Sequence, residues 1–123
     1  MNFKPCSEQE IAEMNLWKKG EYPFEILNAF EKASKTSGKP MIELKLKLSN
    51  GDGQGKTIKD YLMQQMPGKL RHAAIVCGLL DKYLSGSLAD VDFVGRTGRL
   101  KLGVEKDKSG QYPPKNVVLD YVC

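Results

Sequence analysis

The chain has 123 residues, enough for one domain that buries a core without disulfide or metal support. Hydrophobic residues make up 41% and charged residues 28%, which excludes a disordered chain, and no apolar run is long enough to span a membrane. The formal net charge of +4 is unevenly distributed: residues 1–33 contain four lysines and six glutamates, whereas residues 34–123 contain 15 Lys or Arg and nine Asp or Glu. A basic body of this kind is compatible with a polyanionic partner.

The three cysteines, Cys6, Cys77 and Cys123, are an odd count without C-x-x-C spacing. This pattern argues against a disulfide framework and a zinc site, and it favours reduced thiols in a cytosol. The first residues also lack the pattern of a signal peptide. The sequence therefore predicts a cytoplasmic protein.

The chain is expected to divide into an N-terminal leader, residues 1–19, and one main domain, residues 20–123. Ser7 and Glu10 have the spacing of a capping box, so the leader is expected to form a short helix over about residues 8–18.

The main domain reads as three strands, one helix and two strands. Alternation is clearest in PMIELKLKLS (40–49), where leucines and charged residues take turns. After Pro67-Gly68, apolar residues recur at helical spacing. The expected strands cover about residues 22–32, 42–48, 56–62, 99–106 and 116–122, the expected helix covers about 69–84, and one further short helical turn is expected near 87–90.

The stretch SNGDGQGKT (49–57) raises the alternative of a phosphate-binding loop, because it follows a strand and ends in Gly-Lys-Thr. In that motif the first glycine would have to stand at Asn50, and the preceding strand would have to be apolar on both faces. The residues after Thr57 also favour a strand over a helix. A hairpin connection is therefore expected, and an NTPase is the minor alternative.

Five short strands with one helix between the third and the fourth match the Greek-key OB barrel, a mainly β fold. The helix would plug the bottom of the barrel. The side chains expected to point inward are Phe24, Ile26, Ile42, Leu44, Leu46, Leu48, Ile58, Leu100, Leu102, Val104 and Val118.

Several short stretches carry a family resemblance over about residues 20–122. They are GEYPF (20–24), SGKPMI (37–42), DYL (60–62) and VGRTGR (94–99), and their order and spacing are more specific than any one of them. In these stretches the chain resembles the bacteriophage-type OB-fold single-stranded-DNA-binding proteins. The resemblance implies sequence-nonspecific binding of single-stranded DNA in phage replication or recombination, within the cytoplasm of a bacterial host. It also implies phage recombination or replication proteins as further partners.

Such binding needs cations that follow the phosphates and aromatic faces on which bases stack. In OB folds the groove crosses strands two and three and is flanked by the loops between strands one and two and between strands four and five. The cations expected there are Lys35, Lys39, Lys45, Lys47, Lys56, Lys59, Arg96, Arg99, Lys101, Lys106 and Lys108. The first choices for stacking are Phe30 and Tyr112, followed by Tyr61 and Trp17.

Signals for catalysis are weak. His72 is the only histidine and has no recognisable nucleophile partner, and the aspartates lack metal-ligand spacing, so neither an enzyme nor a cofactor is expected. Two alternatives stay open: the domain could be an adaptor that docks a phage recombinase or replication protein, or its nucleic acid could be RNA.

Overall fold

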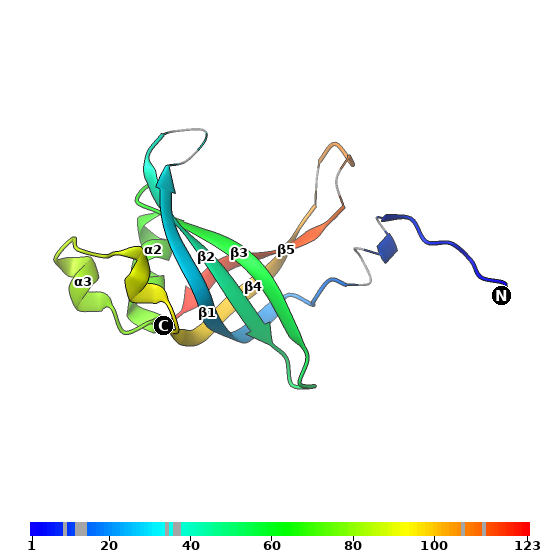
Figure 1. Cartoon of the computed structure of the whole chain (residues 1–123), viewed down its shortest axis with the longest axis horizontal. Coiled ribbons are helices and arrows are strands. Elements are labelled where there is room, and N and C mark those ends of the chain that lie inside the picture. Colours follow the sequence, from blue (N-terminus) through cyan, green and yellow to red (C-terminus); the bar gives the residue numbers. More distant parts are fainter. Residues whose placement is uncertain (9, 12–14, 34, 36–37, 107, 112) are drawn as a thin grey trace.

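The computed structural model describes residues 1–8, 10–11, 15–33, 35, 38–106, 108–111 and 113–123. Five antiparallel strands form one curved sheet in the order β3-β2-β1-β4-β5, and the helices gather at one end of it (Figure 1). The expected mainly β architecture with five antiparallel strands is confirmed. The strands are β1 (Gly20–Ala33), β2 (Pro40–Ser49), β3 (Gly55–Met63), β4 (Thr97–Glu105) and β5 (Lys115–Val122).

The stretch 49–57 forms a β-hairpin, as expected, with residues 50–54 as the connection between β2 and β3. Ser49 pairs with Gly55, and from there β2 and β3 run antiparallel. Asn50 organises the turn, because its side-chain Oδ1 accepts hydrogen bonds from the backbone N–H groups of Asp52 (2.9 Å) and Gln54 (3.1 Å). Antiparallel pairing directly after the loop is incompatible with the parallel strand–loop–helix unit of a phosphate-binding loop.

Between β3 and β4 the chain forms α2 (Pro67–Val76), α3 (Leu80–Leu84) and a 3-10 turn, η1 (Asp90–Phe93). The single helix expected over 69–84 is therefore wrong. Gly78 adopts a φ of 74°, and the backbone N–H groups of Gly78 and Leu79 donate to the carbonyls of Ile75 and Ala74. This is the Schellman arrangement that ends a helix at glycine. No helix within the described residues is long and apolar enough to cross a membrane.

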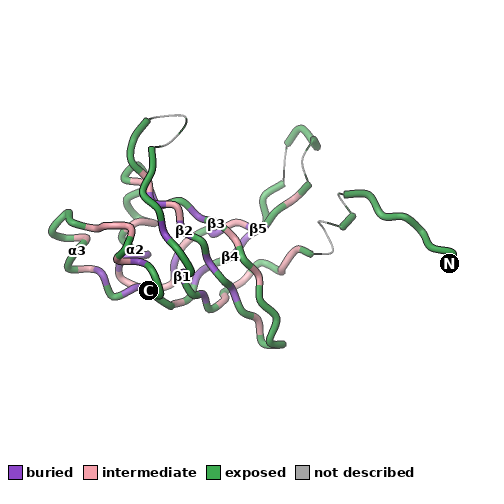
Figure 2. The backbone as a smooth tube through the Cα atoms, in the orientation of Figure 1, coloured by how far each residue is buried: buried purple, intermediate pink, exposed green. Residues whose placement is uncertain are grey.

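The core lies between the inner face of the sheet and α2. Figure 2 shows buried and exposed residues alternating along the strands. Most of the expected inward residues are buried, but Ile58 is only partly buried and Val104 is exposed. Val104 lies near the end of β4, where it pairs with Asn116 of β5. Among the described residues, the buried hydrophobic side chains outside the expected set are Ala29, Leu62, Ala73, Ala74, Cys77, Leu79, Phe93 and Tyr121.

The edge strands β3 and β5 approach each other and are joined through side chains. The Tyr121 hydroxyl donates to Asp60 Oδ2 (2.8 Å), and both residues are buried. Lys69 of α2 donates to Asp60 Oδ1 (2.7 Å) and to the carbonyl of Val118 (3.0 Å). One hydrogen-bonded cluster therefore connects β3, α2 and β5.

The last residues of the leader, around Trp17, are hydrogen-bonded to β5 of the sheet. Asn116 of β5 accepts from the Trp17 N–H (2.8 Å) and donates to the Trp17 carbonyl (2.9 Å). The Trp17 ring lies 5.2 Å from that of Tyr22. Ser7 caps a helical turn as expected, since its Oγ accepts from the Glu10 N–H (3.2 Å), but the expected helix does not extend to residue 18. The Trp17 backbone is bound to Asn116 instead.

Candidate nucleic-acid interface

The outward side chains of β1, β2 and β3 form one exposed surface, which we call the β1–β3 face. Its members follow from the strand register, because directly paired residues point to the same side of a sheet. Phe30, Glu43 and Tyr61 form one row across the three strands, and Lys45 pairs with Lys59 in the next row. The β1–β3 face consists of Phe30, Glu43, Tyr61, Asn28, Lys45, Lys59, Glu25, Lys47 and Thr57.

Two aromatic rings on this face are available to a ligand. Phe30 is 53% exposed and Tyr61 is 36% exposed. Each large apolar ring in contact with water is a surface on which a base could stack. The neighbouring Lys59 side chain is 63% exposed, so a cation lies within the same open surface.

Glu43 lies between Phe30 and Tyr61 and binds three neighbouring side chains through its carboxylate. Its Oε1 accepts from the Tyr61 hydroxyl (3.1 Å) and from Lys32 Nζ (3.2 Å), and Lys59 Nζ lies 3.8 Å away. The hydrogen bond from Lys32 outweighs desolvation and lowers the pKa of Glu43. Burial and the bond to Glu43 raise the pKa of Tyr61. Glu43 is therefore an ionised acceptor and Tyr61 a protonated donor at neutral pH.

The cationic surface continues onto β4. Arg99 and Lys101 are exposed and pair with Pro23 and Glu21 of β1, respectively. A hollow of about 470 Å³ is lined by residues of β1, β2 and β4, among them Lys47 and Arg99. The hollow thus links the lysines of the β1–β3 face to the cations of β4.

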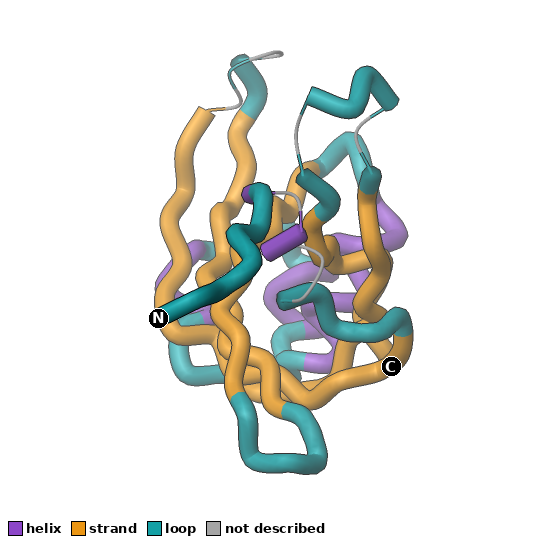
Figure 3. Tube along the Cα trace, turned by 90° about the vertical axis from the view of Figure 1, so that its right-hand side faces the viewer, coloured by secondary structure: helices purple, strands orange, loops and turns teal. Residues whose placement is uncertain are grey.

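The expected loop cations lie at one end of the molecule. The connections β1–β2 and β4–β5 both rise from the same end of the sheet (Figure 3). Lys35 and Lys39 belong to the first connection and Lys106 and Lys108 to the second, and all four are exposed. Tyr112, one of the two first-choice stacking residues, lies outside the described residues.

Two expected cations lie elsewhere. Lys56 pairs with Leu48 and shares the inner side of β3 with Ile58, so it cannot point outward with Lys59. Its Nζ donates to the carbonyl of Asn15 in the leader (3.0 Å).

Arg96 lies just before the first residue of β4, apart from Arg99. Its side chain lies on the side that faces α2, where Nε donates to the Asp92 carbonyl (3.1 Å). A Cβ atom at Gly78 would lie 3.9 Å from its guanidinium. The position of Lys56 follows from the register of β3, whereas Arg96 precedes β4 and is bound to η1.

Glu43 and Lys32 were not expected at the site. A signal for Glu43 was present, because the alternation in residues 40–49 places it outward beside Lys45. Its partner Tyr61 follows only when the hairpin is closed at Ser49 and Gly55, which fixes the register of every later pair.

Other reactive groups do not assemble at this face. His72 Nδ1 lies 2.9 Å from Asp120 Oδ1 on the α2–β5 side. Desolvation is the largest influence and raises the pKa of Asp120, but the hydrogen bonds from His72 and from the Tyr121 N–H, together with nearby positive charge, outweigh it, so the pKa is lowered. Burial raises the pKa of Cys77 to about 11, so its thiol stays protonated. Within the described residues, no cluster of three or more His, Cys, Asp or Glu could hold a metal ion.

No protein-family model and no curated protein matches the sequence.

Proposed function

We propose that this protein binds single-stranded DNA without sequence preference, on an OB-type barrel, in phage replication or recombination inside a bacterial cell. The observation that carries the proposal is the row of Phe30 and Tyr61 next to the paired lysines Lys45 and Lys59, all on one exposed face. Rings take up bases and cations take up phosphates, and this combination is what an unpaired strand requires.

The sheet supports the OB interpretation in two ways. Its strand order, β3-β2-β1-β4-β5, makes β3 and β5 the edge strands, and these two strands are in contact. Asp60 and Tyr121 then join these edges, with α2 packed beside them. In an OB barrel the ligand crosses strands two and three between two flanking loops, and the β1–β3 face lies on those strands. The family resemblance of the sequence favours the same function.

A duplex is a poorer partner for this face than a single strand. Stacking on Phe30 and Tyr61 requires bases whose faces are free, and a duplex buries these faces in its own stack. We therefore expect short single-stranded DNA to bind at least tenfold more tightly than a duplex of the same length, and we expect little difference from single-stranded RNA unless a contact reads the 2′-hydroxyl.

The test combines charge reversal with a matched control. Lys45→Glu with Lys59→Glu should weaken binding of labelled oligo-dT in fluorescence anisotropy by about 100-fold or more, because two phosphate partners become repulsive. Lys18→Glu with Lys19→Glu makes the same change of charge at exposed leader residues and should cost much less. Equal losses in the two double variants, or equal binding of duplex and single strand, would refute the proposal.

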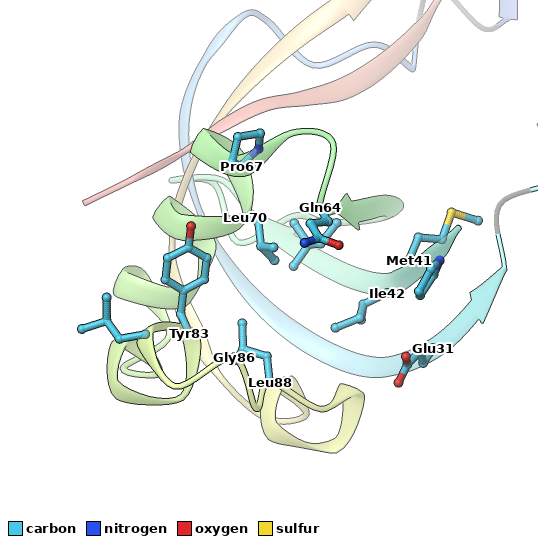
Figure 4. Close-up of a pocket in the computed structure, with 12 residues that line it drawn as sticks. Glu31, Met41, Ile42, Gln64, Pro67, Leu70, Tyr83, Gly86 and Leu88 are labelled. Carbon is cyan, nitrogen blue, oxygen red and sulfur yellow. The ribbon is translucent and has the colours of Figure 1, made fainter. Parts of the chain in front are cut away.

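A second candidate is a protein-docking adaptor, and one observation favours it. An apolar groove of about 660 Å³ lies between the strand ends of β1–β3 and the helices α2 and α3 (Figure 4). Ile42, Leu70, Tyr83 and Leu88 contribute to its walls. Grooves with such walls accept apolar side chains of a partner protein.

The two candidates use different surfaces, so variants can separate them. Leu84→Glu changes an exposed residue at the groove, and it should leave binding of oligo-dT within about twofold of the unaltered protein. An adaptor with incidental DNA contact would instead keep its partner in the Lys45→Glu, Lys59→Glu protein and lose it in Leu84→Glu.

A further inference from the structure

Glu43 is a carboxylate in the middle of a face otherwise suited to a polyanion. It pairs with Phe30 on one side and with Tyr61 on the other, so it lies between the two rings on which bases would stack. The carboxylate cannot lie against a phosphate without strong repulsion. Phosphates must therefore follow the lysine rows, and Glu43 must face sugar or base edges.

The two carboxylate oxygens have different roles. Oε1 is engaged by Tyr61 and Lys32, with Lys59 nearby. Within the described residues, Oε2 has no hydrogen-bond partner. The side chain is 14% exposed, so it is held in place by its neighbours and retains contact with the surface. A fixed acceptor of this kind can take one N–H from a ligand.

Base edges differ in what they offer to such an acceptor. Cytosine presents the N4 amino group, which donates to carboxylates in known recognition geometries. Thymine and uracil present a carbonyl oxygen at the same position, and that oxygen is repelled by a carboxylate. A base stacked beside Glu43 is therefore favoured when it carries an amino group at position 4.

We propose that Glu43 is a specificity-determining residue that makes this face prefer cytosine over thymine and uracil. The inference rests on the proposed function, since it refines the ligand of the same face. It adds a bias between pyrimidines to a surface whose stacking and charge contacts are indifferent to sequence.

The experiment compares oligo-dC, oligo-dT and oligo-dU of equal length in anisotropy titrations, at mildly alkaline pH where cytosine runs stay unpaired. We expect oligo-dC to bind about fivefold more tightly than the other two. Oligo-dU controls for the thymine methyl group. Replacing cytosine by N4,N4-dimethylcytosine removes the donated hydrogens and should abolish the advantage.

Three variants test whether Glu43 determines the preference for cytosine. Glu43→Gln keeps the size of the side chain, but its amide can donate to the 4-carbonyl, so the preference should fall below about twofold. Glu31→Gln makes the same chemical change at the apolar groove and should retain the full preference. Tyr61→Phe removes only the hydroxyl bond and should also retain it, which separates base reading from support of the Tyr61 ring.

The outcomes distinguish the inference from the function on which it rests. Equal, salt-sensitive binding of all three oligonucleotides would overturn the inference and leave single-strand binding intact. A preference for cytosine that survives in Glu43→Gln would also overturn it. If none of the oligonucleotides binds, the proposed function fails and the inference fails with it.

Discussion

Asp60 is a buried carboxylate whose hydrogen-bond partners come from two other elements, Lys69 of α2 and Tyr121 of β5. A charge removed from water must be compensated by a partner of opposite charge or by hydrogen bonds. Burial raises the pKa of Tyr121 well above its ordinary value, and the nearby Asp60 charge adds to this. The phenol therefore remains a donor, and the carboxylate is satisfied from both sides.

Removing the carboxylate should cost more than removing the phenol hydroxyl. Asp60→Ala leaves the largely buried Lys69 ammonium without its counter-charge, so we expect the free energy of unfolding to fall by about 3 kcal/mol or more. Tyr121→Phe leaves the Asp60–Lys69 pair in place and should cost about 1–2 kcal/mol. Urea unfolding measures both values.

Tyr22→Phe provides the matched control for this comparison. The Tyr22 hydroxyl donates to the Lys18 carbonyl (2.7 Å) at an exposed site, so its loss should change the free energy of unfolding by about 0.5 kcal/mol or less. If Asp60→Ala costs no more than this control, the cluster does not hold β3 and β5 together.

At the scale of elements, Gly98 determines how closely α2 approaches β4. A Cβ atom at this position would overlap Val76 Cγ1 of α2 and would lie 3.1 Å from the ring of Phe24. The helix therefore rests on a strand position where no side chain fits. Because no side chain lies between them, Val76 of α2 packs close to the Phe24 ring at this position.

Gly98→Ala should lower the free energy of unfolding by about 1–3 kcal/mol, the usual cost of overpacking a core. Val76→Ala removes the colliding methyl, so the double variant should be less destabilised than the sum of the two single variants. Gly51→Ala meets no atom within 4 Å at ordinary φ and should be close to neutral. Additive costs in the double variant would argue against contact between Gly98 and Val76.

The sequence predicts a helix, strand or turn well where residues close in the chain determine it. Alternation in residues 40–49 correctly predicts β2, and the hairpin after it follows from Asn50 and its glycines. The helix break at Gly78 was not predicted, because apolar residues recur at helical spacing both before and after this glycine.

Long-range contacts could not be predicted in the same way. The bond between Asn116 and Trp17 joins residues 99 positions apart, and no local pattern specifies it. At the candidate site, Lys45 and Lys59 were expected on one face and are paired there, whereas Lys56 binds the Asn15 carbonyl of the leader and Arg96 binds the Asp92 carbonyl of η1. The place of Lys56 required the register of β3, and the place of Arg96 required the contact between η1 and the residue before β4.

At the scale of the whole molecule, the arrangement of charge matters more than the net charge of +4. The outward cations lie on the neighbouring strands β2 and β3 and, across β1, on β4, and a hollow lined by Lys47 and Arg99 connects the two groups. Carboxylates interrupt this surface: Glu25 pairs with Lys47, and Glu21 pairs with Lys101. A bound DNA strand would therefore contact only a fixed, small number of lysines and arginines, even when the DNA is long.

The salt dependence of binding should reveal that number. If Lys45, Lys47, Lys59, Arg99 and Lys101 each neutralise one phosphate, the logarithm of the affinity for oligo-dT should fall against the logarithm of the salt concentration with a slope of about −3.5. Lys59→Ala should make this slope shallower by about 0.7, whereas Lys19→Ala in the leader should leave it unchanged. A slope near zero, or equal slopes for Lys59→Ala and the unaltered protein, would contradict a phosphate path along these strands. The slope counts the ions released on binding and is insensitive to stacking, so it tests the cationic path independently of Phe30 and Tyr61.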